Sequence, residues 1–169
     1  GPAGENLVRY ACVIADARRA AGRTGMGCVM GSKKLKAIVI AGDREIKLAN
    51  PEEAKKLGAE GYKDVLSKTG YKSWKAQGTM STIVWSQTHG VLPTTNYREG
   101  VFDQADAISG DTMEKMVVEN RGCPNCNMTC GNVIKDSNGE PSELDYENVA
   151  MLGSNINIGD LKHVAALNR

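Results

Sequence analysis

Residues 7–41 read LVRYACVIADARRAAGRTGMGCVMGSKKLKAIVIA and define the pattern of the first part of the chain. Two apolar runs, residues 7–15 and 35–41, are rich in Val and Ile and are short enough to be buried strands. The connector between them is basic and contains four glycines, Gly22, Gly25, Gly27 and Gly31. This pattern predicts a strand, a glycine-rich turn and a second strand.

The rest of the chain has mainly helical patterns. Helices are expected at residues 50–68, 79–88, 111–120, 146–152 and 160–168. Asn50 and Pro51 favour the start of the first helix, because Asn can cap it and Pro suits its first turn. Residues 131–141 predict a hairpin with Asn138 and Gly139 in its turn, and residues 91–107 predict an ordered loop.

A shift in composition at residues 43–50 indicates a domain boundary. We therefore expect an α+β protein, in which residues 1–47 are the end of a β-sheet domain and residues 48–169 begin a mainly α-helical domain. The chain does not start with Met and stops inside an expected helix, so we also expect it to be an internal fragment of a longer polypeptide.

Overall composition excludes several classes of protein. The 169 residues carry 21 Lys and Arg against 20 Asp and Glu, a net charge of +1 that gives no sign of a nucleic-acid or membrane partner. No apolar run is long enough for a transmembrane helix. Five cysteines are an odd number and not a dense disulfide framework, so a reducing, cytoplasmic location is expected.

Three of the five cysteines lie in the segment GCPNCNMTCG, residues 122–131. Cys123, Cys126 and Cys130 have C-x2-C-x3-C spacing, which allows three thiolates to face one centre from a short loop. Thiolates select zinc or iron–sulfur clusters, and three close cysteines with a distant fourth are typical of a [4Fe-4S] cluster. The isolated His89 and His163 offer no obvious second half of a zinc site. Spacing favours the cluster, with zinc or simple buried thiols as alternatives. Cys12 and Cys28 are expected to be small buried residues.

The glycine-rich basic segment RAAGRTGMG, residues 19–27, could bind an anion. Glycine allows backbone N–H groups to approach a phosphate closely, and arginine offers a planar fork of donors. The segment lacks the P-loop pattern, and a structural turn with solvated arginines is the alternative.

Taken together, several segments of the chain resemble the aldehyde ferredoxin oxidoreductases, tungsten or molybdenum enzymes with a bis-pterin cofactor and a [4Fe-4S] cluster. The matching segments follow the family's order and cover nearly the whole chain: GPAGENLVRYA, RAAGRTGMGCVMGSKKLKAIVI, GVLPTTNYREGVF, ISGD, CPNCNMTCG and DYENVAMLGSN. One departure is TTNY at residues 94–97, where TRNF is commoner, which weakens any pterin or interface role for Thr95.

The resemblance implies roles for particular residues. Arg19, Ala20, Gly22 and Arg23 would contact the pterin and its phosphates. Cys123, Cys126 and Cys130 would be the first three cluster ligands, with the fourth cysteine in a later domain outside this chain. Glu147 would reach the region of the metal site, although it could equally be an exposed acid at a helix start. His89 and His163 match no family histidine and are expected to be structural or superficial.

The resemblance also implies an activity. Residues 1–47 would be part of the pterin-cradling domain of an enzyme that oxidises aldehydes to carboxylic acids. Electrons would leave through the cluster to ferredoxin or another electron-carrier subunit. The remaining partners would be the rest of the polypeptide and further copies in a homo-oligomer. The alternatives are a paralogous metallopterin subunit, such as an aromatic acyl-CoA reductase, a small zinc-stabilised binding module, and an electron-transfer or structural piece without its own active site.

Overall fold

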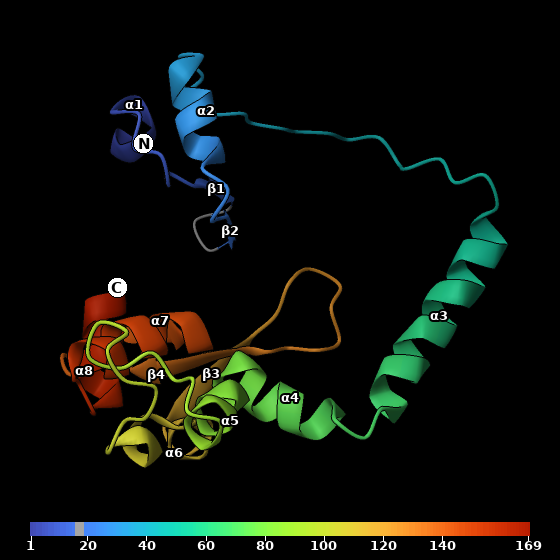
Figure 1. The fold of residues 1–169 in the computed structure, drawn as a ribbon. Coiled ribbons are helices and arrows are strands. Elements are labelled where there is room, and N and C mark those ends of the chain that lie inside the picture. The colour runs from blue at the N-terminus through green and yellow to red at the C-terminus, as the bar shows by residue number, and fades with distance from the viewer. Residues whose placement is uncertain (16–18) are drawn as a thin grey trace. The chain divides into compact units, whose positions relative to one another are not determined.

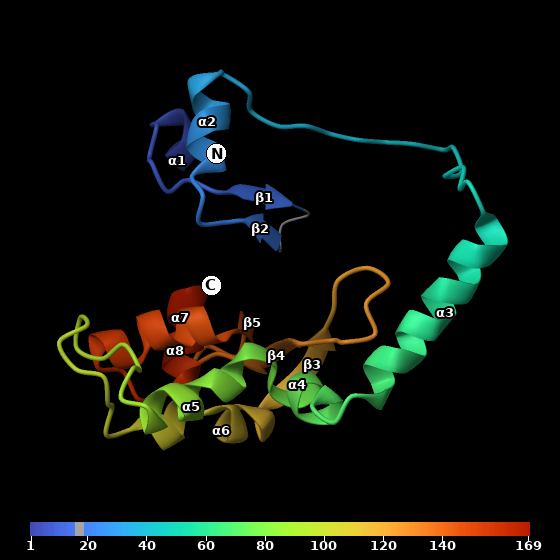
Figure 2. The same ribbon diagram turned by 45° about the vertical axis from the view of Figure 1, so that its right-hand side comes forward.

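The chain contains both helices and short antiparallel sheets, which makes it an α+β protein (Figures 1 and 2). The computed structural model describes residues 1–15 and 19–169. These divide into two compact units, an N-terminal unit (Gly1–Lys47) and a C-terminal unit (Leu48–Arg169), and each is described by itself.

The N-terminal unit consists of two short helices and one β-hairpin: α1 (Pro2–Glu5), β1 (Val13–Ala15), β2 (Arg19–Ala21) and α2 (Met26–Ser32). The strands are antiparallel, with Val13 opposite Ala21. Glycines bring the backbones into direct contact. A Cβ atom on Gly4 would lie 2.6 Å from the Gly27 carbonyl oxygen, and one on Gly27 would lie 2.5 Å from that of Cys12. Side chains at these positions would force α1, α2 and the start of β1 apart.

The strands expected in this unit are only partly correct. Of residues 7–15, the last three form β1, and the glycine-rich connector forms β2 and α2 and not a simple turn. The expected strand at residues 35–41 is wrong. Its apolar side chains are exposed, up to 91% for Val39, and no described strand pairs with it. A strand needs hydrogen-bonding neighbours, and the described part of this unit provides none at that position.

The C-terminal unit begins with α3 (Pro51–Ser67), as expected. The side chain of Asn50 accepts a hydrogen bond from the Glu53 amide at 3.2 Å, so the predicted cap is confirmed. After α3 come α4 (Tyr71–Gln77), the 3-10 helix η1 (Gly78–Ser81) and α5 (Thr82–Thr88). The helix expected at 79–88 is thus a 3-10 turn followed by an α-helix, and α4 was not predicted.

A three-stranded antiparallel sheet follows, with β3 (Val117–Arg121), β4 (Gly131–Lys135) and β5 (Pro141–Leu144) in sequence order. The hairpin between β4 and β5 confirms the prediction, and Gly139 adopts a φ of +85° in its turn. The helix expected at 111–120 is half wrong. Residues Gly110–Glu114 form α6, capped by Ser109, but the β-branched Val117 and Val118 belong to β3. Pairing with β4 overrides the helical pattern there.

The predicted loop at residues 91–107 has little regular structure, apart from a single bridge between Thr94 and Glu99 and the start of η2 (Ala105–Ile108). It is nevertheless well anchored, because the amides of Thr95 and Asn96 donate to the carbonyls of Ser154 and Asn155 in η3 (Ser154–Ile156). These bonds hold three consecutive residues, 95–97, at positive φ.

The last two helices, α7 (Tyr146–Leu152) and α8 (Leu161–Asn168), match their predictions. They pack with η1, α5, α6 and the sheet around one hydrophobic core. Its fully buried side chains are Met80, Ile83, Leu92, Ile108, Met113, Ile134, Leu144, Val149, Ala150, Val164 and Ala165. In the described parts of the chain, none of the helices has the length and apolar character needed to cross a bilayer.

A buried carboxylate closes the turn between β4 and β5. One oxygen of Asp136 accepts hydrogen bonds from the amides of Asn138 at 2.7 Å and Glu140 at 2.9 Å. Its other oxygen lies 3.4 Å from Nε of Arg169. Burial by itself raises the pKa of Asp136, but the two amides and the guanidinium outweigh it, so the pKa is lowered.

This lowered pKa predicts acid sensitivity. Because the folded state favours the charged form, Asp136 stabilises the fold above its unfolded pKa of about 3.9, and this contribution is lost as pH falls through the lower folded value. We expect Asp136→Asn to be less stable than the wild type at pH 7 in urea unfolding, with the difference shrinking below about pH 4. Asp103→Asn, in an exposed loop, is the control. A difference that stays constant from pH 7 to pH 3 would contradict this role.

Candidate functional site

The three clustered cysteines lie on the connection between β3 and β4, residues 122–130, which we call the cysteine loop. Arg121 pairs with Gly131, so the two ends of the loop are adjacent. Both views show the loop extending beyond the ends of the strands toward α3 (Figures 1 and 2). Within it, the Cys126 amide donates to the Cys123 carbonyl at 3.1 Å, and Asn125 between them has a φ of +59°. The first two cysteines thus sit on one tight turn.

Chemically, the loop suits a soft metal or cluster. Cys123 and Cys126 are exposed and Cys130 is half-buried, and none of the cysteines in the described part of the chain forms a disulfide. Thiolates are the preferred protein ligands of iron–sulfur clusters and of structural zinc. Among the described residues, no three His, Cys, Asp or Glu side chains are already gathered to hold a metal ion. The loop therefore carries the right type of ligand for such a group. Its side chains are not already gathered around one metal position.

Two helices contact the cysteine loop through tyrosines. The Tyr62 hydroxyl, on α3, donates to the Asn125 carbonyl at 2.8 Å, and the Tyr71 hydroxyl, on α4, donates to the Asn127 carbonyl at 2.9 Å. The Asn127 side chain donates in return to the Tyr62 carbonyl at 3.0 Å. No sequence motif indicates these contacts, since the partners are 56 to 65 residues apart.

Cys130, at the other end of the loop, is supported by the core. The buried Asn132 side chain donates to the Cys130 carbonyl at 3.2 Å and accepts from Asn120 at 2.8 Å. Gly78 lies against the same carbonyl, because a Cβ atom there would be 2.5 Å from the oxygen. Gly78 also has a φ of +56°, which an L side chain would strain.

Arg121, the residue before the cysteine loop, has its positive charge balanced by nearby carboxylates. Arg121 donates two hydrogen bonds to the Glu119 carboxylate, at 2.8 and 2.9 Å, and these bonds raise the pKa of Arg121. Glu143, on β5, lies 4.0 Å from the same guanidinium. The base of the cysteine loop thus holds a guanidinium between two carboxylates.

The four residues expected to contact pterin lie next to one another in the N-terminal unit. Arg19 and Ala20 are on β2, and Gly22 and Arg23 follow it before α2. Ala20 and Arg23 are exposed, whereas Arg19 and Gly22 are half-buried. They offer backbone and guanidinium donors on an accessible edge of the hairpin.

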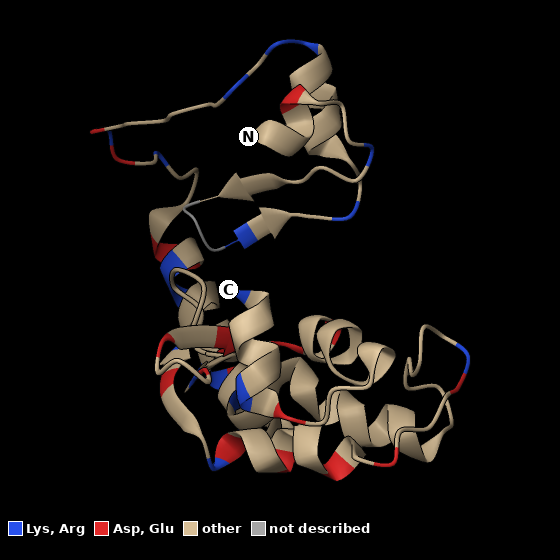
Figure 3. Cartoon of the chain, turned by 90° about the vertical axis from the view of Figure 1, so that its left-hand side faces the viewer, with Lys and Arg blue, Asp and Glu red and all other residues tan. Residues whose placement is uncertain are grey.

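Charge is distributed unevenly between the two units. The first 47 residues contain nine Lys and Arg against four Asp and Glu, a net charge of +5, and residues 48–169 contain twelve against sixteen, a net charge of −4. Figure 3 shows Lys and Arg at several bends of the N-terminal unit, including the segment after β2. The net charge of the whole chain is therefore near zero although its N-terminal unit is basic and suits an anionic ligand.

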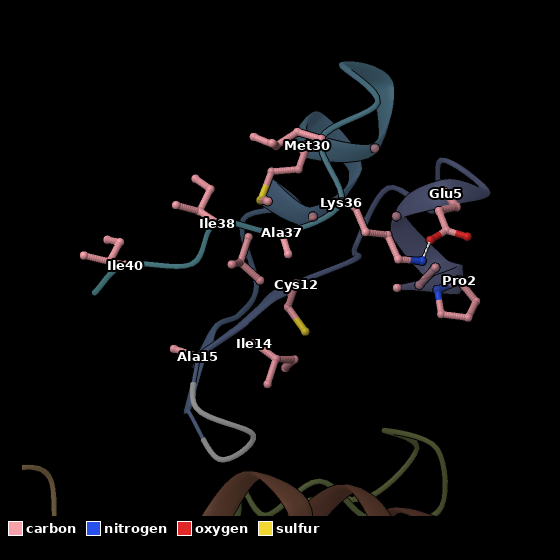
Figure 4. A pocket seen from close by; sticks show the side chains of 17 residues that line it. Pro2, Glu5, Cys12, Ile14, Ala15, Met30, Lys36, Ala37, Ile38 and Ile40 are labelled. Carbon is pink, nitrogen blue, oxygen red and sulfur yellow. Dashed lines mark hydrogen bonds and ion pairs between the residues drawn. The ribbon is translucent and has the colours of Figure 1, made fainter. Parts of the chain in front are cut away.

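The N-terminal unit also contains a pocket of about 840 Å³ that sequence patterns did not indicate. Its walls come from α1, β1, α2, residues 35–38 and Ile40, and Figure 4 shows Met30, Ile38 and the Cys12 side chain around it. Cys12 is exposed, so its expected burial is wrong. Lys36 forms an ion pair with Glu5 at the rim, and that hydrogen bond, with the charge of Lys36, lowers the pKa of Glu5. The four expected pterin contacts lie outside the described lining of this pocket.

Glu147 lies exposed in the first turn of α7. Asp145 caps this helix, and the Asn148 side chain accepts from the Asp145 amide at 2.8 Å.

Of the two histidines, His89 stacks on Trp85 with ring centres 4.3 Å apart, and His163 is exposed on α8. Both histidines are therefore at the surface of the C-terminal unit.

Comparison with known proteins gives a consistent result over both units. Residues 1–42 match the family described as "Aldehyde ferredoxin oxidoreductase, N-terminal domain", and residues 56–169 match "Aldehyde ferredoxin oxidoreductase, domains 2 & 3". The chain is 38% identical to the tungsten-containing aldehyde ferredoxin oxidoreductase of Pyrococcus abyssi and 36% identical to that of Thermococcus kodakarensis. It is 29% identical to the "Aliphatic sulfonate oxidoreductase, WOR-like subunit" of Pyrococcus furiosus.

Each of these alignments covers 99% of the chain but 28% of the relative, so the chain spans somewhat more than a quarter of their length. The two family domains match in order, and their ranges, residues 1–42 and 56–169, include the basic glycine-rich segment and the cysteine loop. The chain belongs to the aldehyde ferredoxin oxidoreductase family.

Proposed function

We propose that this chain is part of a tungsten–pterin oxidoreductase of the cytoplasm that oxidises aldehydes to carboxylic acids and passes the electrons to ferredoxin. The observation that carries the proposal is the cysteine loop, three thiols on one strand connection, in a chain similar throughout to relatives named as tungsten-containing. When bound, the pterin–metal group would supply a two-electron oxidation in which aldehyde and water give the acid, two protons and two electrons, and a [4Fe-4S] cluster would carry those electrons singly.

The residues of this chain would bind and orient these groups. Cys123, Cys126 and Cys130 would hold the cluster as thiolates, with the fourth ligand from the rest of the polypeptide. Arg19 and Arg23, with the backbone at Ala20 and Gly22, would bind the pterin phosphates, for which the +5 charge of residues 1–47 is suitable. The Glu147 carboxylate would accept a proton released from the substrate or water.

A second candidate keeps the same scaffold and changes the substrate. The aliphatic sulfonate oxidoreductase subunit is also similar over 99% of the chain, at 29% identity. A different electron donor or acceptor and a different small substrate would then replace the aldehyde and ferredoxin. Rates measured with aldehydes and with aliphatic sulfonates, using the same purified protein, would separate the two.

The cluster assignment predicts a specific loss of iron. In the full-length protein we expect tungsten together with about four iron atoms per chain. Replacing Cys123, Cys126 or Cys130 with Ser should remove most of the iron and the broad visible absorbance, since each substitution removes one thiolate ligand. Cys12→Ser, in the N-terminal unit, should leave iron unchanged. Zinc in place of iron would contradict the cluster and support the zinc-stabilised module.

Arg23 provides a test of the pterin-binding segment. A charge-assisted hydrogen bond to phosphate contributes about 1.5–3 kcal/mol, so Arg23→Ala should weaken retention of the pterin by about tenfold or more. The measurement is tungsten per chain after extensive dialysis. Arg44→Ala, an exposed arginine outside the segment, is the matched control. Equal tungsten in both variants would argue that residues 19–23 form a structural turn.

Glu147 is tested by removing its charge and keeping its shape. We expect Glu147→Gln to lower the rate of aldehyde oxidation by about 10² to 10⁴ if the carboxylate accepts a proton, with tungsten and iron contents unchanged. Glu140→Gln, an exposed acid in the turn before β5, should keep the wild-type rate. A rate within about twofold of the wild type would contradict a catalytic role. Glu147 would then be an acid at the helix start that interacts favourably with the dipole of α7.

A further inference from the structure

The cysteine loop is held from outside the sheet by two tyrosine hydroxyls, and both bonds lie next to one cysteine. Tyr62 binds the carbonyl of Asn125, the residue before Cys126, and Tyr71 binds the carbonyl of Asn127, the residue after it. We propose that Tyr62 and Tyr71 are positioning residues that fix the orientation of Cys126 as a cluster ligand. The proposal rests on the [4Fe-4S] function proposed above.

The peptide group between Asn125 and Cys126 is fixed on both sides. A peptide is planar and trans, so its C=O and N–H point in opposite directions. Here the oxygen accepts from Tyr62 at 2.8 Å, and the Cys126 N–H donates to the Cys123 carbonyl at 3.1 Å. Rotation of this plane would break both bonds. Since the plane carries the Cα of Cys126, the two bonds together restrict where its thiol can point.

The carbonyl of Asn127, two residues after Asn125, is restrained in the same way. Tyr71 donates to Asn127 at 2.9 Å, and the Asn127 side chain returns a bond to the Tyr62 backbone at 3.0 Å. Tyr62 therefore takes part twice, once through its hydroxyl and once through its carbonyl. Both tyrosine hydroxyls bind backbone carbonyls of asparagines and not cysteine side chains, and the Cys126 thiol itself donates to the Met128 carbonyl at 3.4 Å.

The position of α3 supports this role. None of its residues is buried, and Leu57 and Leu66 are 57% and 52% exposed, so the helix is not held by packing into the core. Its Asn50 cap gives the helix a defined start, and its contact with the loop runs through Tyr62. Because α3 has no buried side chains and is joined to the cysteine loop by hydrogen bonds, we infer that it holds the loop in place and contributes little to the core.

The third thiol is held by different means. Cys130 is fixed through Asn132 and Gly78, which belong to the folded core. Loss of the tyrosine hydroxyls should therefore affect the half of the loop around Cys126 and leave Cys130 in place. Hydrogen bonds and orientation around iron–sulfur ligands set the reduction potential of a cluster, which gives the proposal a measurable consequence.

The test compares Tyr62→Phe, Tyr71→Phe and the double variant with the wild type, as full-length protein purified without oxygen. Phenylalanine keeps the ring and removes the hydroxyl. Tyr10→Phe is the matched control, because Tyr10 lies in the N-terminal unit and is 81% exposed. We expect iron release to a chelator to be about fivefold faster for each lost hydrogen bond. The reduction potential of the cluster, followed by electron paramagnetic resonance, should shift in both single variants and more in the double one.

Hydrogen exchange of the same proteins gives a readout that does not depend on the cluster. Amides of residues 122–128 should exchange faster in the tyrosine variants, with protection of β4, α7 and α8 unchanged. Faster exchange throughout the C-terminal unit would overturn the proposal, because it would show a general structural role.

The remaining outcomes separate this proposal from the one on which it rests. Absence of iron from the wild type would refute the cluster function itself, and with it any positioning of a cluster ligand. Iron in the wild type, combined with wild-type release rates and potentials in both phenylalanine variants, would overturn only the role of the tyrosines.

Discussion

The antiparallel pairing of Arg121 with Gly131 is the constraint on which the cysteine loop depends, because it fixes both ends of the loop against the core. Along β4, residues 131–134 are all buried, whereas most of β3 is exposed. Consecutive strand residues point to opposite faces, so the fully buried Val133 and Ile134 show that β4 is covered on both sides. The central strand is therefore part of the core, and its pairing with β3 places both ends of the cysteine loop beside that core.

The 3-10 helix η1 connects this loop to the rest of the C-terminal unit. Gly78 lies against the Cys130 carbonyl, Thr79 accepts a hydrogen bond from the Tyr146 amide at 3.0 Å, and Met80 is fully buried. Three consecutive residues thus contact the cysteine loop, the start of α7 and the core. A side chain at position 78, where φ is +56° and ψ is −137°, would cost about 1–3 kcal/mol for its backbone conformation alone, before any displacement of Cys130. The cysteine loop and α7, the helix that carries Glu147, are therefore both held by η1.

Local signals in the sequence were sufficient where the structure is local. Asn50 caps α3, Asn138 and Gly139 turn the β4–β5 hairpin, and the bounds of α7 were as expected. Prediction failed where distant pairing decides the outcome, as in β3, where Val117 pairs with Ile134 of β4, and at residues 35–41, which lack a described partner. For the same reason the cysteines could be found from their spacing, whereas Tyr62, Tyr71 and Gly78 could not: their partners are distant and carry no motif.

The two units also differ in how they can be stabilised. In the C-terminal unit, large buried side chains from helices and sheet form one core. Among the described residues of the N-terminal unit, Ala11 is the one buried hydrophobic side chain, while Ile38, Val39 and Ile40 are 68%, 91% and 89% exposed. A segment of 47 residues buries too little surface for a strong core of its own. The described contacts between α1, α2 and the residues before β1 are instead close backbone approaches at Gly4 and Gly27, where a side chain would not fit.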